Sequence, residues 1–69
     1  MRLRDGMIEW LGECFEGENF VAMSTAALMD GIERHWEGGM RDFLDSNPDL
    51  VDVNAMSTLH KWTRKRYSV

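Results

Sequence analysis

The apolar residues nearest the N-terminus recur at every third or fourth position. The set with this spacing is Leu3, Met7, Leu11 and Cys14. The pattern predicts an amphipathic helix that buries one side. The segment 16–19, Glu-Gly-Glu-Asn, is expected to end this helix, because glycine and asparagine tolerate the left-handed backbone conformation found at helix ends. On this pattern we expect Cys14 to be a small residue of the core.

A second apolar stripe predicts another helix in the middle of the chain. Its members are Leu28, Met29, Ile32 and Trp36. Ser24 or Thr25 is expected to cap its start, and the pair Gly38-Gly39 to end it. Gly31 lies inside this helix, where glycine costs about 1 kcal/mol relative to alanine. It therefore indicates either a close helix crossing or a weak point.

The last third of the chain predicts two more helices. A short one carries Met40, Phe43 and Leu44 and is expected to end at 46–48, Ser-Asn-Pro, because proline disfavours the α conformation of the residue before it. Residues 50–53 are interpreted as an extended connector or a single helical turn. The final helix is expected to start at a cap and to turn three apolar side chains inward. The candidate caps are Asn54 and Ser57, and the inward side chains are Met56, Leu59 and Trp62.

These elements predict an all-α fold, a single domain over residues 1–69 with about four short helices. Residues 6–25 and 39–58 agree at seven of twenty aligned positions, including the tetrapeptide Ala-Met-Ser-Thr. The period of thirty-three residues is in the range of repeat architectures. Because the shared positions are apolar helix positions and segments suited to capping, we interpret them as two similar helix–loop–helix halves.

The thirty-three-residue spacing and several segments resemble ankyrin repeats. Residues 26–32 resemble the inner helix of that family and residues 40–44 the end of its outer helix. Residues 47–52 are similar to the turn between repeats, and residues 57–60, Ser-Thr-Leu-His, to the start of another inner helix. The resemblance implies a surface that binds other proteins and no catalysis.

Charge is distributed unevenly along the chain, whose net charge is −4. Up to Leu59 there are twelve acidic residues and four arginines, a net charge of −8. From His60 onward there are four basic residues and no acid, a net charge of +4. The basic end would attract a nucleic-acid backbone, whereas the acidic body would repel one. The simpler alternative is that these cations complement the dipole at a helix C-terminus.

Residues 57–66 also resemble the recognition helix of a helix-turn-helix DNA-binding protein. The resemblance implies contacts to DNA from Ser57, His60, Lys61, Arg64, Lys65 and Arg66. The connector 47–56 is longer than the usual turn of three to four residues. A capped helix lined with leucine and tryptophan is also ordinary core construction, and that alternative stays open.

The sequence predicts no enzyme, no metal site and no cofactor. Cys14 is the only cysteine among the 69 residues, so an internal disulfide is impossible, and the chain is expected to be cytoplasmic. His35 and His60 have no local ligand spacing with Cys14. The N-terminal segment 1–6 has no long apolar run, and no stretch is long enough to span a membrane.

We therefore predict a small regulator or inhibitor that binds another protein, of the kind mobile genetic elements often encode. An acidic helical surface with tryptophan and methionine anchors would contact a basic patch on that partner. The expected partner-binding residues are Met29, Glu33, Trp36, Glu37 and Trp62. A chain this short with three tryptophans is also expected to self-associate. The alternative function is a helix-turn-helix transcriptional regulator.

Overall fold

The fold is all-α, as the sequence predicts. The structure, a computed structural model, describes residues 2–66. Within that range it has two short 3₁₀ turns and no strand. The elements in order are α1 (Leu3–Cys14), η1 (Phe20–Ala22), α2 (Thr25–His35), α3 (Gly39–Ser46), η2 (Pro48–Leu50) and α4 (Val53–Arg66).

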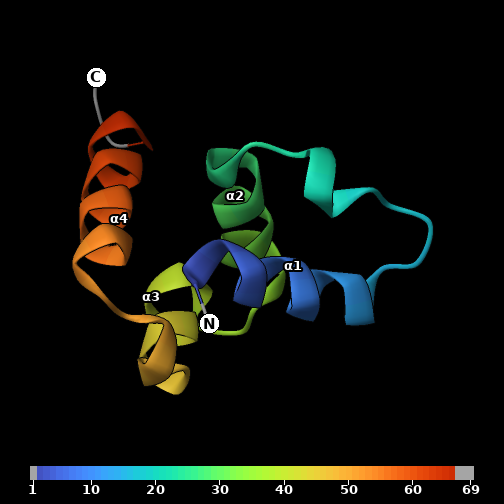
Figure 1. Ribbon diagram of the computed structural model, residues 1–69, viewed down its shortest axis with the longest axis horizontal. Helices are drawn as coiled ribbons and strands as arrows, with labels where there is room; N and C mark the ends of the chain where they lie inside the picture. The colour runs from blue at the N-terminus through green and yellow to red at the C-terminus, as the bar shows by residue number, and fades with distance from the viewer. Residues whose placement is uncertain (1, 67–69) are drawn as a thin grey trace.

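Helix α2 packs against both α1 and α3, and these three helices enclose the core. Figure 1 shows α1 crossing α2 at the centre of the molecule, with α4 along one edge and the loop between α1 and η1 at the opposite edge. The fully buried side chains are Met7, Leu11, Leu28, Met29, Ile32, Met40 and Phe43. Helix α4 packs less closely on the rest and buries only Ala55 completely among its described residues.

The internal repeat corresponds to two helices that build the core. Met7 and Leu11 of α1, and their counterparts Met40 and Leu44 of α3, are all buried. The tetrapeptides that follow behave differently. Ala-Met-Ser-Thr at 22–25 leads into α2, whereas the copy at 55–58 lies inside α4. The repeat therefore reflects buried positions that α1 and α3 share. The segments that follow these two helices do not have the same structure.

The caps of α2 explain its bounds. The hydroxyl oxygen of Ser24 accepts a hydrogen bond of 3.1 Å from the amide of Ala27, which confirms Ser24 as the N-cap. After α2 the chain reverses at Gly38 and Gly39, whose φ angles of +92° and +79° lie in the left-handed region. A Cβ atom on Gly39 would also overlap the carboxylate of Glu33. This glycine pair lets α3 fold back immediately.

The start of α4 differs from the prediction. Asp52 is the cap, because its Oδ1 accepts a hydrogen bond of 2.7 Å from the amide of Ala55 and the helix begins at Val53. Asn54 and Ser57, the expected caps, both lie inside the helix. A carboxylate at this position also complements the positive end of the helix dipole. In the helix as it stands, Ala55 is buried in the core and Met56 is half exposed. The predicted inward position of Met56 is therefore wrong.

Cys14 is exposed, so its predicted place in the core is wrong. Helix α2 crosses α1 at Leu11, where a Cβ atom on Gly31 would lie 3.6 Å from the Leu11 methyl carbons. Cys14 is the last residue of α1, beyond this crossing, and the chain turns away after it. The crossing at Gly31 is close, but a methyl group there would make an ordinary contact, so the site does not demand glycine.

Candidate functional site

Three aromatic rings from different elements gather on one side of the molecule. Trp10 of α1 and Trp36, which follows α2, have ring centroids 5.0 Å apart and pack edge to face. Phe43 of α3 completes the group, 4.9 Å from Trp36 and 6.4 Å from Trp10. Phe43 is buried, whereas the two indoles are half-buried and remain available on one side. Such edge-to-face pairs add about 0.5–1.5 kcal/mol each beyond the area they bury.

The turn between α2 and α3 places Trp36 in this cluster. Its backbone amide donates to Ile32 as the C-cap of α2. Its indole Nε1 donates to Oδ2 of Asp42 on α3, at 2.8 Å. Glu33 supports the same turn, because its Oε1 accepts a hydrogen bond of 3.0 Å from the amide of Met40. Trp36 is therefore fixed to both helices.

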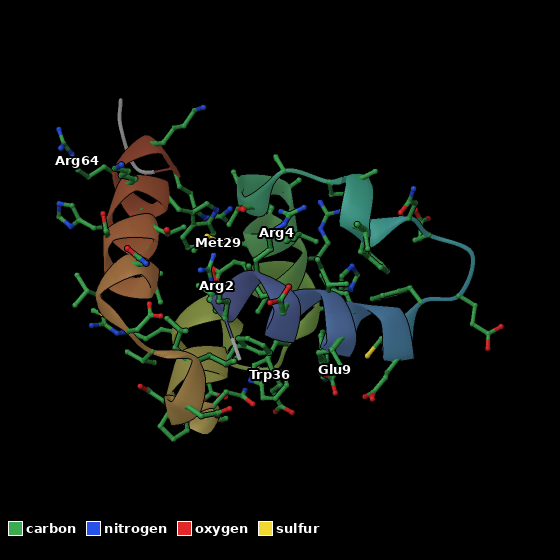
Figure 2. The ribbon with its side chains drawn as sticks, viewed as in Figure 1. Arg2, Arg4, Glu9, Met29, Trp36 and Arg64 are labelled. Carbon is green, nitrogen blue, oxygen red and sulfur yellow. The ribbon has the colours of Figure 1, made fainter. Side chains whose placement is uncertain are left out.

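A hollow of about 320 Å³ opens over the three rings. Its walls include three carboxylates, Glu9, Glu13 and Asp49. Glu9 and Glu13 lie four residues apart on α1 and flank Trp10 in the sequence. Figure 2 shows Glu9 and Trp36 on the same side of the molecule, below α1. We call this site the acidic aromatic hollow.

Gly6 explains why Asp49 reaches this hollow. An ideal Cβ atom at Gly6 would lie 2.5 Å from a methyl carbon of Leu50, so the missing side chain lets η2 approach α1 closely. Both Gly6 and Leu50 are buried. Asp49, the residue before Leu50, is exposed and therefore lies on the rim rather than inside the core.

The electrostatic character of the acidic aromatic hollow differs from that of other hollows. No cationic side chain of the described residues lines it. A larger hollow of about 690 Å³ between α1, η1 and α2 carries Arg34 and Arg66 in its walls. Another of about 380 Å³ beside α4 includes Arg41. Their mixed charges favour no one class of ligand, whereas aromatic rings with carboxylates and no cationic side chain favour a cation.

The predicted partner-binding residues do not form one surface. Trp36 lines the acidic aromatic hollow, but Trp62 of α4 lies elsewhere and donates its indole N–H to Asp30 at 2.9 Å. Met29 is fully buried and belongs to the core, so its predicted role as a surface anchor is wrong. The carboxylate of Glu33 binds the backbone of α3, so of the two predicted acids only Glu37 is exposed.

The residues that sequence reasoning missed are Glu9, Trp10, Glu13, Phe43 and Asp49. Trp10 and Phe43 are equivalent positions of the internal repeat, which was a signal of shared packing. No local pattern indicated that Trp10 meets Trp36, because that contact depends on how α1 crosses α2.

The predicted nucleic-acid-binding residues are exposed on α4. Ser57, His60 and Arg64 follow helical spacing along one face, and Figure 2 shows Arg64 pointing away from the body of the molecule. Lys61 and Lys65 are exposed beside this row. Arg66 instead binds the body, because its guanidinium lies 5.2 Å from the Trp62 ring and 3.4 Å from Asp30.

The connector that precedes α4 bears on the resemblance to a helix-turn-helix. Residues 47–52, which include η2, connect α3 to α4, and this connector is longer than the usual turn of three to four residues. Helix α3 itself has only eight residues.

The other residues weighed for chemistry lie apart. His35 packs against Phe15, with ring centroids 4.5 Å apart, while His60 is on the outer face of α4 and Cys14 ends α1. Within residues 2–66, no three His, Cys, Asp or Glu side chains come together in a way that could hold a metal ion. None of the helices described in this range has the length and apolar character needed to cross a membrane.

Comparisons with protein-family models, with curated proteins and with solved structures find no match for this chain.

Proposed function

We propose that this chain is a non-enzymatic regulator or inhibitor that binds a basic segment of another protein through the acidic aromatic hollow. The observation that carries this proposal is the combination of three aromatic rings and three carboxylates in one hollow, without a cation of the described residues in its walls. Tryptophan is enriched among residues that dominate binding energy, and carboxylates around such an anchor select for positive charge.

The rigidity of the hollow supports a binding role. Trp36 is held by Asp42 and by two ring contacts, so little side-chain entropy remains to be lost when a partner binds. The uneven charge of the chain, −8 up to Leu59, would also steer a basic partner toward this body. A small rigid domain of this kind regulates by covering the basic surface of its partner and needs no chemistry of its own.

The test compares two variants with the same change in charge. The first replaces the rim of the hollow with Glu9→Gln, Glu13→Gln and Asp49→Asn. The matched control replaces three exposed acids outside the hollow, with the substitutions Glu16→Gln, Glu18→Gln and Asp45→Asn. Calorimetry at low ionic strength measures how each binds a short peptide that contains both arginine and lysine.

We expect the rim variant to lose about tenfold in affinity and the control to lose at most about threefold, because the rim carboxylates face the bound cation and the control carboxylates do not. Equal losses in the two variants would contradict the proposal, since they would indicate general attraction to an acidic protein. A wild-type protein that does not bind the peptide at low ionic strength would also contradict it.

One observation favours a second function, binding of DNA by α4. The described helix has no acidic residue, and Ser57, His60, Lys61 and Arg64 are all exposed on it. Cations arranged along an outward helix face suit a phosphate backbone. The connector between α3 and α4 does not favour the helix-turn-helix form of this proposal, so the contact would come from α4 alone.

The second function is tested with Lys61→Ala combined with Arg64→Ala. Arg66 is left intact because it helps to hold α4 on the body. The control, Arg2→Ala with Arg41→Ala, removes the same charge from other exposed positions. If α4 binds DNA, the first variant has lower affinity for a duplex. The slope of log affinity against log salt concentration should also become less steep, by the amount expected for the loss of about two phosphate contacts. No duplex binding by the wild type at low salt would rule this function out.

A further inference from the structure

Among residues 2–66, a tryptophan, an aspartate and an arginine contact one another between α2 and α4. Trp62 donates its indole N–H to Oδ1 of Asp30 at 2.9 Å. The guanidinium of Arg66 lies over the Trp62 ring, 5.2 Å from its centroid, and 3.4 Å from the same carboxylate oxygen. Arg66 thus contacts both the face of the Trp62 ring and the carboxylate that accepts the hydrogen bond from the Trp62 indole. The three residues come from α2 and α4 and join these helices.

Trp36, which lines the acidic aromatic hollow, belongs to a second tryptophan–aspartate pair. Trp36 donates its indole N–H to Oδ2 of Asp42 at 2.8 Å. Trp36 is half-buried and Asp42 is exposed, so both remain accessible from outside. Within residues 2–66, Asp42 makes no ion pair, and no cationic side chain lines the hollow beside Trp36. Arg41, its neighbour in the sequence, lines a different hollow next to α4.

We propose that an arginine side chain of a basic partner protein completes this second arrangement. Its guanidinium contacts the accessible part of the Trp36 indole and binds the carboxylate of Asp42. Its remaining N–H groups face the rim carboxylates of Glu9 and Glu13. This inference rests on the proposed function of the hollow and names the side chain that the hollow selects.

The chemistry of the hollow favours arginine over lysine. A guanidinium is planar, stacks on aromatic rings and presents five N–H donors, whereas an ammonium group is compact and strongly hydrated. The hollow offers an indole and several carboxylates at separate positions, which a single ammonium group cannot contact together. Glu9 and Glu13 lie one helical turn apart on α1, so their side chains are about 5–6 Å apart at Cβ. The five N–H donors around a guanidinium can bind more than one carboxylate at a time.

The test uses three versions of one short glycine- and serine-based peptide, with a single arginine, lysine or citrulline at its centre. Citrulline keeps the shape of arginine without its charge. Calorimetry with the whole protein is expected to give binding of the arginine peptide about fivefold tighter than that of the lysine peptide, and no measurable binding of the citrulline peptide. Equal affinity for arginine and lysine would overturn the inference while leaving the acidic aromatic hollow as a site for basic segments.

Protein variants then locate the contact. Asp42→Asn keeps an oxygen that accepts the Trp36 hydrogen bond but removes the charge, and it is expected to reduce the preference for arginine over lysine to about twofold or less. Asp45→Asn, one turn away in α3, is the control and is expected to leave the preference unchanged. An unchanged preference in Asp42→Asn would overturn the assignment to Trp36 and Asp42.

A second copy of the chain is the other possible source of arginine, because Arg64 is exposed. The indole N–H signals of the protein alone, recorded at increasing concentration, distinguish the two sources. Signals that do not move support a separate partner. Movement of the Trp36 signal with concentration would assign the contact to self-association and overturn the proposal of a partner protein, and its loss in Arg64→Ala would identify Arg64 as the arginine.

Discussion

The carboxylate of Glu33 accepts a hydrogen bond of 3.0 Å from the backbone amide of Met40, and this bond closes the turn between α2 and α3. The acceptor satisfies one of the free amides at the start of α3, and its charge complements the helix dipole. Because Trp36 and Asp42 lie on either side of this turn, the geometry of the acidic aromatic hollow depends on it.

Replacement of Glu33 should therefore destabilise the fold. We expect Glu33→Ala to lower the free energy of unfolding by about 1–2 kcal/mol, because the amide of Met40 loses its partner. Glu33→Gln keeps an oxygen acceptor and should lose less. The control Glu37→Ala, at an exposed acid, should change stability by no more than about 0.5 kcal/mol. Urea denaturation measures all three, and equal stability of Glu33→Ala and Glu37→Ala would contradict this role.

Asp30 holds α4 on the body of the molecule. Its carboxylate accepts from Trp62 and pairs with Arg66, and both bonds are exposed, so each is weak. We expect Asp30→Ala to lower stability by about 1 kcal/mol and to speed amide exchange in α4 more than in α1 or α2. Asp45→Ala serves as the control. Exchange that accelerates equally in all helices would show that α4 does not open separately.

Two glycines of α1 should respond to alanine in opposite ways. A Cβ atom added to Gly12 would have no other atom within 4 Å, so Gly12→Ala should stabilise the helix by up to about 1 kcal/mol. Gly6 faces the buried Leu50, and Gly6→Ala forces a shift that costs about 1–3 kcal/mol. Thermal unfolding of the two variants should therefore rank Gly12→Ala well above Gly6→Ala. The reverse order would mean that η2 does not approach α1 as described.

The exposure of Cys14 has a direct chemical consequence. An aromatic disulfide reagent should label this thiol in the folded protein at a rate close to that of the denatured chain. Cys14→Ser should leave the melting temperature nearly unchanged, because the side chain leaves no cavity behind. Slow labelling that becomes fast only in denaturant would indicate that Cys14 is buried.

Local periodicity was sufficient to predict the four helices. The spacing of Leu3, Met7 and Leu11 alone identifies the buried face of α1, because any partner helix must cover that stripe. The same reasoning failed for Cys14. Periodicity shows which side of a helix is apolar, but it does not show how far along the helix other elements pack against that side. The packing of α2 against α1 ends near Leu11, where α2 crosses α1 at Gly31.

The start of α4 shows the limit of cap prediction. Asp52, Asn54 and Ser57 all lie within one and a half helical turns, and each has a side chain that can cap a helix. The packing of Ala55 into the core decides in favour of Asp52. Such a choice depends on contacts with distant residues, which a local pattern does not contain.

The acidic aromatic hollow could be predicted only in its parts. The sequence indicated an acidic surface with a tryptophan anchor, and it pointed to Trp36 as an anchor. It offered no means of pairing Trp36 with Trp10, because the two residues are 26 positions apart and meet through a helix crossing. Nor could it separate Glu33, which caps α3, from Glu9 and Glu13, which line the hollow.

The central claim is that the acidic aromatic hollow binds a cationic side chain, and the three tryptophans provide the most direct test. Trp10 and Trp36 line the hollow, whereas Trp62 lies outside it and binds Asp30. The three indole N–H signals in a ¹⁵N-correlated NMR spectrum can be followed while an arginine-containing peptide is added. We expect the signals of Trp10 and Trp36 to move and that of Trp62 to stay in place. Movement of the Trp62 signal alone, or of none of the three, would contradict the account.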